Sequence, residues 1–293
     1  MQNVKGILLI VAAMLGFSLE DMFIKSLSAT LPTGQILMSL GLGSVGIFVL
    51  LARLQGHRIF TAAGWSPMMI LRASCEAVGA MMFATALARV DISTVAAVFQ
   101  TLPLVITMGA ALFLGEQVGW RRWSAIATGF AGVLLIIRPG LDAFDPNTLL
   151  VLGSVFAIAL RDLLTRRIDV AVSSYVVSLQ GFLSLIPAGA LMVAMGSTGY
   201  QSLQTPELSM LAGAILFGTT AYLGIVTAMR IGEASVVAPF RYSRLVFSMA
   251  LGMLVFGEKP DLPTLAGAAL IIASGLYTFV REQRLARAAT AGN

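Results

Sequence analysis

The sequence predicts an all-α integral membrane protein with ten transmembrane helices, arranged as a 5+5 inverted repeat. Three observations carry this prediction. The 293 residues are 58% hydrophobic and only 11% charged, with a mean hydropathy of +0.90. Apolar runs long enough to cross a bilayer follow one another with short joints, and two segments share a pattern at a fixed offset. Soluble domains carry roughly a quarter charged residues, so this chain lacks the polar surface of a water-soluble protein.

The ten predicted spans follow from the length that a bilayer requires, which is about 20 apolar residues. Turn residues and charges separate the runs, as in Arg138-Pro139-Gly140. The short segment before the first run has no small-residue cleavage site, so we expect a retained helix rather than a signal peptide. The runs lie at 6–27, 33–53, 66–88, 93–114, 121–138, 148–166, 173–195, 208–230, 235–256 and 262–280.

The distribution of lysine and arginine predicts the orientation. An even number of spans puts both termini on one side, and cytoplasmic loops hold the excess of basic residues. On the side of the termini the predicted topology places Lys5, Arg53, Arg58, Arg121, Arg122, Arg166, Arg167, Arg230, Arg281, Arg284 and Arg287. On the opposite side it places only Lys25, Arg89, Arg138 and Lys259. We therefore expect a multi-pass protein of a bacterial-type inner membrane with both termini in the cytoplasm. The net charge of +5 is scattered rather than gathered in a stripe, which argues against a nucleic-acid partner.

A repeat divides the chain into two predicted halves, 1–140 and 141–293. At an offset of 142 residues Ser93 meets Ser235, and Gly115-Glu116 meets Gly257-Glu258. Each half holds five spans, and because five is odd the second half is inserted upside down relative to the first. Inverted repeats with a site at their interface are typical of secondary transporters that work by alternating access.

Two blocks and the segment after the first carry a resemblance to a known family. They run from Ala86-Leu87-Ala88-Arg89-Val90 to Gly115-Glu116, from Ala228-Met229-Arg230-Ile231-Gly232 to Gly257-Glu258, and from Gly129 to Pro139. Over nearly its full length the chain resembles the ten-helix EamA-type members of the drug/metabolite transporter superfamily.

The resemblance implies five-helix repeats in both halves, a cavity between them, and proton-coupled or exchange transport in either direction. It implies a secondary active permease for a small polar metabolite, and the basic residues of the ninth span favour an anionic or zwitterionic one, such as an amino acid or a carboxylate. A riboflavin-type vitamin importer of the same superfamily is the alternative.

The ninth span holds the first candidate site residues. Charges inside a bilayer are costly and generally line cavities or pair with one another. Arg241 and Arg244 stand three apart and so share one face of a helix, where their guanidinium groups suit a carboxylate or phosphate. This run departs from the more apolar ninth helix of many relatives. The alternative is a structural ion pair with an acid on another helix. Tyr242, Tyr222 and Gln100 complete the predicted solute site.

Prolines and carboxylates mark further candidate positions. Pro239 and Pro103 predict interruptions in spans 9 and 4, although they do not align in the repeat. Glu20 and Asp21 in span 1 are candidates for proton coupling, because a desolvated carboxyl has a raised pKa. The alternative for Glu20 is a charge at the helix end that reaches the membrane interface. We expect Asp21 to pair with Lys25, four residues on.

The third and sixth spans also carry charges. Arg72 and Glu76 form an i,i+4 pair for which a purely structural role is the favoured interpretation, and Glu76 stays a candidate for solute binding because it lies near mid-span. We expect Arg161 and Asp162 to join Arg166 and Arg167 in a cluster at the inner boundary. Glu116 and Glu258 are expected to mark helix ends.

Other function classes lack their chemistry in this sequence. The single cysteine, Cys75, excludes a cysteine metal cluster, and the single histidine, His57, falls in a predicted loop. There is no HExxH motif and no phosphate-binding loop, so an intramembrane enzyme or an ATP-driven pump is disfavoured. A channel ranks below a carrier because the repeat lies within one chain. We expect no cofactor and no metal; the partners are membrane lipid, a small-molecule solute and, as candidate coupling ion, the proton, with the oligomeric state left open.

Overall fold

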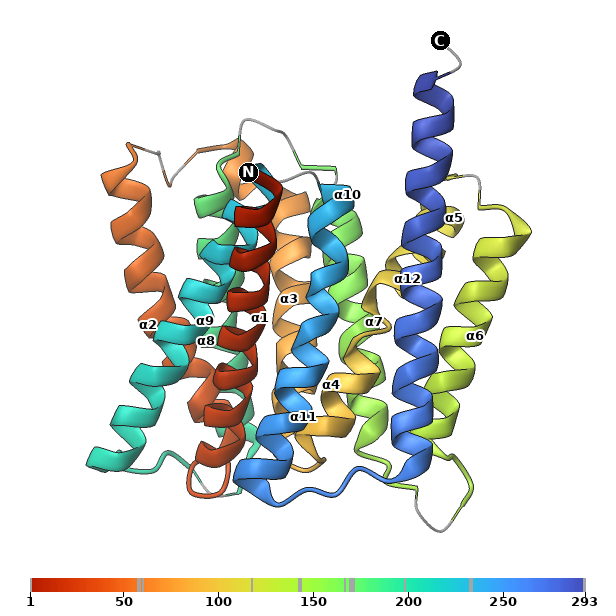
Figure 1. Cartoon of the computed structure of the whole chain (residues 1–293). Coiled ribbons are helices and arrows are strands. Elements are labelled where there is room, and N and C mark those ends of the chain that lie inside the picture. Colours follow the sequence, from red (N-terminus) through yellow and green to blue (C-terminus); the bar gives the residue numbers. More distant parts are fainter. Residues whose placement is uncertain are drawn as a thin grey trace. The chain divides into compact units, whose positions relative to one another are not determined.

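The structure, a computed structural model, describes residues 2–56, 59, 61–116, 118–141, 144–165, 167–168, 172–197, 199–231 and 234–291 (Figure 1). These residues form helices joined by short turns, and no strand occurs among them. The all-α prediction is therefore confirmed for this part of the chain.

The helices begin and end within a few residues of the predicted spans, except at the two chain ends. In order they are α1 (Gln2–Leu27), α2 (Thr33–Leu54), the short 3₁₀ helix η1 (Ala63–Trp65), α3 (Pro67–Leu87), α4 (Ile92–Phe99), α5 (Leu102–Phe113), α6 (Trp120–Ile137), α7 (Thr148–Thr165), α8 (Ser174–Met195), α9 (Thr205–Ile231), α10 (Ala234–Val237), the 3₁₀ helix η2 (Ala238–Tyr242), α11 (Ser243–Phe256) and α12 (Leu262–Ala291). The last helix outruns its predicted span because the residues after it are rich in alanine and arginine, which favour helix.

In the part of the chain that the structure describes, eight helical segments are long and apolar enough to cross a membrane. Of the ten predicted runs, 121–138 and 235–256 are not among the eight. The first corresponds to α6, whose opening residues Trp120-Arg121-Arg122-Trp123 lower its hydropathy. The second is divided among α10, η2 and α11 by the interruption at Pro239. The structure thus describes a multi-pass membrane protein.

Both predicted helix interruptions are confirmed. The fourth span breaks between α4 and α5, with Pro103 in the first turn of α5, and the ninth breaks at η2, where Pro239 occupies the first turn. A proline removes a backbone donor and clashes with the preceding turn, so a helix restarts there. The prolines do not align, yet the restarts at Leu102 and Ser243 match the 142-residue offset to within one residue.

The two broken helices end in the same way. Gly115 and Gly257 follow α5 and α11 with φ angles of +70° and +66°, a left-handed conformation that glycine adopts without steric cost. The next residue in each case, Glu116 or Glu258, donates its backbone N–H to the carbonyl six residues earlier, at 3.2 and 3.0 Å. The twin Gly-Glu motif therefore specifies one backbone geometry used twice.

The contacts group the chain into two compact units. Unit 1 comprises Met1–Leu19, Asp91–Thr148 and Thr220–Asn293, and unit 2 comprises Glu20–Val90 and Leu149–Thr219. Each unit draws on sequence from both sides of residue 140, and α1 and α9 each contribute to both.

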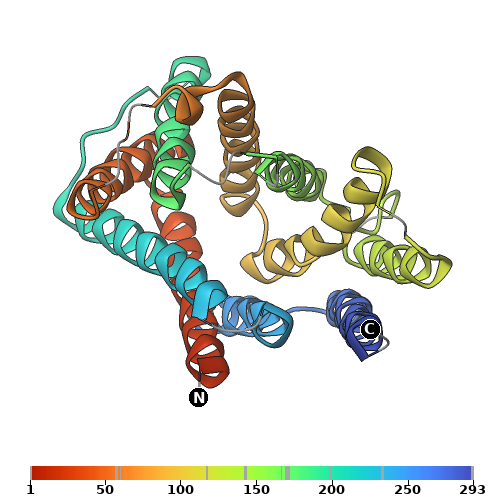
Figure 2. The same ribbon diagram turned by 90° about the horizontal axis from the view of Figure 1, so that it is seen from above.

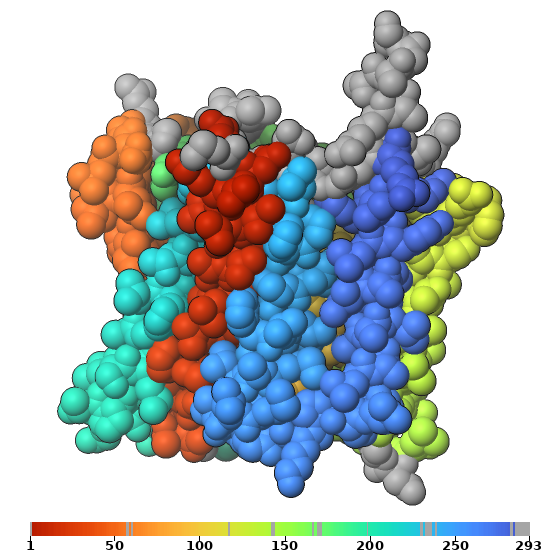
Figure 3. Space-filling model, in the orientation of Figure 1, coloured from red at the N-terminus to blue at the C-terminus, as the bar shows by residue number. Residues whose placement is uncertain are grey.

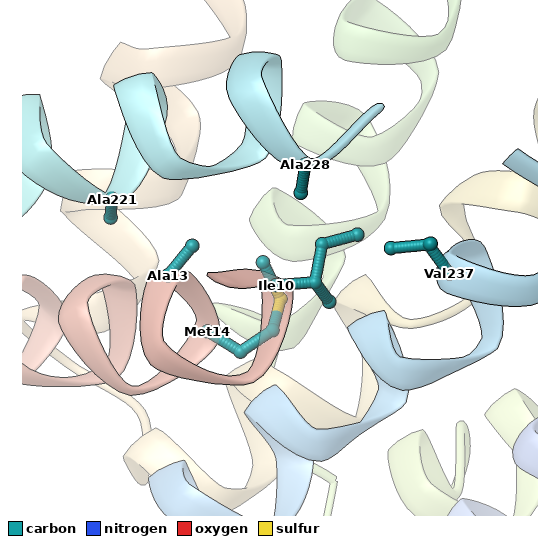
Figure 4. Close-up of a cluster of buried hydrophobic side chains, with 6 residues drawn as sticks. All are labelled: Ile10, Ala13, Met14, Ala221, Ala228 and Val237. Carbon is teal, nitrogen blue, oxygen red and sulfur yellow. The ribbon is translucent and has the colours of Figure 1, made fainter. Parts of the chain in front are cut away.

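Unit 1 is held by an apolar cluster and by a close helix pair. Figure 4 shows the cluster, in which Ile10, Ala13 and Met14 of α1 meet Ala221 and Ala228 of α9 and Val237 of α10. The helices α6 and α12 lie side by side (Figure 2) and approach most closely at two glycines. A Cβ on Gly132 would lie 2.7 Å from the Gly267 carbonyl oxygen, and one on Gly267 would lie 2.5 Å from that of Gly132.

Unit 2 repeats this arrangement with other helices. A Cβ on Gly34 of α2 would lie 2.6 Å from the Gly189 carbonyl oxygen of α8, and a Cβ on Gly189 would lie even closer to the Gly34 carbonyl oxygen. Further along the same pair the rings of Phe48 and Phe182 stack with centroids 5.4 Å apart. Lipid supplies no hydrophobic drive for helix association, so such small-residue contacts are a main source of packing energy.

Glu258 does more than mark a helix end, which corrects the prediction for this residue. Its buried carboxylate caps α4, accepting hydrogen bonds from the backbone N–H of Ile92 at 2.7 Å, from the N–H of Ser93 at 3.0 Å and from the Ser93 hydroxyl at 2.6 Å. Asp91, the residue at the N-cap, makes no side-chain cap hydrogen bond. Gly252 faces this cap closely, since a Cβ there would lie 2.3 Å from the Glu258 carboxylate.

We expect Glu258→Gln to destabilise unit 1. An amide has one acceptor oxygen and no charge, so the substitution weakens three buried hydrogen bonds at a helix N-terminus, at a cost of roughly 1–3 kcal/mol. Thermal unfolding of the purified protein in detergent checks this. Lys259→Gln, on the exposed neighbouring residue, is the control; equal melting temperatures for both variants would contradict the capping role.

We expect Asp261, just before α12, to make the stability of the fold depend on pH. Hydrogen bonds from Thr264, and then the Arg138 guanidinium 2.7 Å away, hold the pKa of Asp261 below its usual range. A lowered pKa stabilises the fold above the unfolded value of about 3.9, and this stabilisation is lost as the pH falls through the folded value. The melting temperatures of the parent and Asp261→Asn should therefore converge as the pH is lowered from about 6 to 3. A constant difference would contradict the assignment.

Candidate functional site

The most distinctive polar feature of unit 1 is Arg244, in the first turn of α11. Its guanidinium carbon lies 5.3 Å from the ring centroid of Phe17 on α1 and 5.4 Å from that of Phe99 on α4. The face of an aromatic ring attracts a cation electrostatically, so both rings favour this position of the guanidinium. The structure thus places two aromatic rings beside Arg244.

A buried pair of hydroxyls fixes the same region of α1 against α11. The Ser18 and Ser248 hydroxyl oxygens are 2.9 Å apart, and both residues are fully buried. The Ser18 hydroxyl also lies within hydrogen-bond distance of the Met14 carbonyl on its own helix and of the Arg244 carbonyl. The backbone that carries Arg244 is thereby tied to the helix that carries Phe17.

The sequence predicts one continuous helix through Arg241 and Arg244, and the structure divides it between the two residues. Arg241 belongs to η2 and is exposed, whereas Arg244 belongs to α11 and is partly buried. Tyr242, between them, lies with its hydroxyl against Gly275 of α12, where any side chain would overlap it.

The other two predicted residues of this group also lie in unit 1. Gln100 follows Phe99 at the end of α4 and is largely buried. Tyr222 is partly buried on α9, next to Ala221 of the apolar cluster. Five of the six predicted solute-binding residues are thus in one unit, and the sixth, Glu76, is in unit 2.

Glu76 lies at the centre of a charge cluster in unit 2. Its carboxylate accepts hydrogen bonds from Arg161 of α7 at 2.8 and 3.0 Å and from Arg72 of α3 at 3.2 Å. Arg161 also donates to Asp162 at 2.6 Å, and Arg72 donates to the Val177 carbonyl of α8 at 3.2 Å. Two cations and two anions make the cluster neutral, which lowers the cost of holding these charges in a membrane helix bundle.

This cluster confirms one prediction and overturns another. The Arg72–Glu76 pair exists, with both side chains largely buried. The expectation that Arg161 belongs to a boundary cluster is wrong, because its guanidinium binds Glu76 near the middle of α3. Spacing along one helix cannot reveal a partner on another. Arg166, also assigned to the boundary cluster, lies outside the described residues, as does His57.

The two coupling candidates also lie in unit 2. Glu20 is partly buried on α1 and packs on Gly218 of α9, where a Cβ would lie 2.4 Å from its carboxylate. Asp21 is buried. Lys25 donates to the Leu87 and Val90 carbonyls at the end of α3, at 3.4 and 2.5 Å, so it interacts favourably with the negative end of that helix.

Sequence reasoning missed Phe17, Phe99 and Ser18. Phenylalanine is common in membrane helices, so the sequence does not distinguish one that contacts a cation. The contact can be recognised only once the structure places a cation from another helix beside the ring. Among the described residues, no group of three or more histidine, cysteine, aspartate or glutamate side chains is placed to hold a metal ion.

The profile described as the EamA-like transporter family matches the chain twice, at residues 4–138 and 147–280. The chain belongs to the EamA-like transporter family. It is therefore a membrane transporter and not an enzyme, as the sequence predicted.

Several characterised transporters are similar to this family member. A riboflavin transporter of Vibrio cholerae is 33% identical over 227 residues, which cover 76% of this chain and 74% of that protein. An S-adenosylmethionine uptake transporter of Rickettsia bellii is 27% identical over 196 residues, 66% of this chain and 65% of that one. A pseudopaline exporter of Pseudomonas aeruginosa is 26% identical over 276 residues, 91% and 93% of the two chains. A protein crystal structure with 17% identity has the same fold, with a TM-score of 0.63 over 94% of this chain and 98% of the other.

We expect Glu76→Gln to destabilise unit 2 strongly. Removing the carboxylate leaves Arg72 and Arg161 close together without their shared anion, and breaking a buried ion pair in this way costs about 3 kcal/mol or more. Thermal unfolding and the yield of folded protein measure the effect. Glu76→Asp keeps the charge and should lose less; a Gln variant as stable as the parent would show that the cluster is not structural.

Proposed function

We propose that this family member is a secondary active transporter of a small anionic or zwitterionic organic metabolite, such as an amino acid or a carboxylate, which contacts Arg244. The observation that carries the proposal is a membrane arginine flanked by two aromatic rings, Phe17 and Phe99. The two rings orient the guanidinium by cation–π attraction. A guanidinium so oriented suits the carboxylate of a solute, because its N–H groups match the two carboxylate oxygens.

The neighbouring residues support the same site. Tyr242 is the last residue of the 3₁₀ helix η2, and Gln100 lies at the end of α4 beside Phe99. Both come from the interrupted helices, and broken helices are where secondary transporters commonly bind solutes. Arg241 and Tyr222 are further candidate residues of this site.

The relatives support two solute classes. S-adenosylmethionine, named for one relative, carries an amino acid group with a carboxylate that an arginine would bind. Riboflavin, named for another, is a flat ring system that would stack on phenylalanine. A riboflavin-type vitamin is therefore the second candidate, favoured by the aromatic pair and by the 33% identity to the Vibrio cholerae protein.

For the architecture, we propose ten spans in two inverted halves, 1–140 and 141–293, that work by alternating access. The double match of the family profile supports it, as do the matching helix restarts and the reciprocal glycine contacts of each unit. Each of those contacts joins helices that correspond at the repeat, α2 with α8 and α6 with α12. We further propose the inner membrane as the location, both termini in the cytoplasm, and the proton as coupling ion, with Glu20 and Asp21 as its candidate carriers.

A ligand screen followed by transport measurements tests the function. Purified protein is heated with amino acids, carboxylates, S-adenosylmethionine or riboflavin. A ligand that binds the folded protein raises its melting temperature, and the increase grows with the ratio of ligand concentration to Kd. The solute that stabilises is then followed in proteoliposomes with and without a pH difference. Stabilisation by a carboxylate-bearing solute supports the first class and by riboflavin the second.

We expect Arg244→Ala to abolish transport of an anionic or zwitterionic solute while folded protein remains in the membrane. The loss of one charged hydrogen-bond partner corresponds to at least a tenfold weaker binding of the solute in the thermal-shift assay. Arg53→Ala, an exposed arginine of α2 in unit 2, is the matched control and should transport normally. Unchanged transport by Arg244→Ala would discard the proposed site.

A further inference from the structure

A groove in unit 1, apart from the proposed solute site, separates α6 from α12. The two helices run antiparallel, meet at Gly132 and Gly267, and diverge toward the beginning of α6. The space between them there measures about 340 Å³, within the range of ligand pockets. We call it the α6–α12 groove; its lining residues are Trp120, Arg121, Ser124, Ala125, Thr128, Ala273, Ser274 and Tyr277. Figure 3 shows α12 in blue against α6 in yellow-green.

The serine and threonine hydroxyls in this groove donate hydrogen bonds to their own helices. Ser124 donates to the Trp120 carbonyl at 3.0 Å, Thr128 to the Ser124 carbonyl at 2.9 Å, and Ser274 to the Ile271 carbonyl at 2.9 Å. A serine or threonine hydroxyl that donates to its own helix presents mainly its carbon atoms to a neighbour. The groove therefore offers a polar solute few donors, and its walls suit an apolar chain.

One end of the groove is cationic and aromatic. Arg121 lies 5.4 Å from the Trp120 ring centroid, and the Arg281 guanidinium lies 4.0 Å from the position of a Cβ on Gly119. Trp120 and Tyr277 are exposed, as is typical of residues at the level of lipid headgroups. No acid occurs among the described lining residues. Gly119 supplies no side-chain cap, so the positive end of the α6 dipole adds to the two arginines.

We propose that the α6–α12 groove binds an anionic phospholipid, with the phosphate at Arg121 and Arg281 and an acyl chain along Ala125, Thr128 and Ala273. The assignment rests on the combination of an apolar channel with a cationic mouth. A free phosphate would contact the mouth only, and a neutral lipid would leave the two arginines without an added anion. Basic pockets between membrane helices are suited to anionic headgroups.

The test uses the purified full chain in detergent with three probes: dioleoylphosphatidylglycerol, dioleoylphosphatidylcholine and inorganic phosphate. Bound lipid is counted by native mass spectrometry, and stabilisation is measured by thermal unfolding. Phosphatidylglycerol should bind and stabilise, phosphatidylcholine should do so several-fold more weakly, and phosphate should have no effect. Arg121→Gln and Arg281→Gln should each weaken phosphatidylglycerol binding roughly fivefold, the usual effect of one cation near an anionic headgroup.

Two further variants locate the site. Ala273→Phe fills the groove and leaves the arginines in place, so it should also reduce phosphatidylglycerol binding. Arg53→Gln removes the same charge from α2 and should leave binding unchanged. Equal binding of the two lipids, full stabilisation by phosphate alone, retained binding in the Arg121/Arg281 double variant, or unaffected binding in Ala273→Phe would each overturn the proposal.

Discussion

Close approach between glycine backbones is the constraint on which the rest of the structure depends. At Gly132 with Gly267, and at Gly34 with Gly189, a single added carbon would lie within 2.7 Å of a carbonyl oxygen of the facing helix. Helices in lipid gain nothing from leaving water, so their association requires surfaces that touch over a long stretch. These contacts bring α6 to α12 and α2 to α8. In unit 2 α3 packs on α8, and in unit 1 α4 contacts both α6 and α12.

Buried polar and charged groups then fix other segments of each unit. In unit 1 the Glu258 carboxylate supplies the cap that α4 lacks, which allows a short helix to begin inside a helix bundle. In unit 2 a neutral group of four charged side chains joins α3 to α7. Both features satisfy charges internally. We assign a solute to Arg244, whose guanidinium lies beside the rings of Phe17 and Phe99.

The sequence was sufficient for most of the helices and insufficient for most of the contacts. Hydropathy and turn chemistry placed the spans to within a few residues, and Pro103 and Pro239 marked the interruptions, because these signals are local. The partner of Arg161 and the rings beside Arg244 depend on which helices meet, which periodicity along one helix does not encode. Glu258 shows the limit most clearly, since its position at a helix end was foreseen and its reach to Ser93 was not.

The division of the chain into units has a consequence for its biosynthesis. Unit 2 draws its last segment from residues up to Thr219, and unit 1 needs Thr220–Asn293, so neither is complete when the ribosome has finished the first 140 residues. The helix α2 is therefore inserted into the lipid before its partner α8 is synthesised, and α6 before α12. Arg72 and Glu76 are likewise inserted before Arg161 is translated. The two units therefore assemble late in synthesis. A nascent chain truncated midway would expose to lipid the glycine-containing faces of α2 and α6.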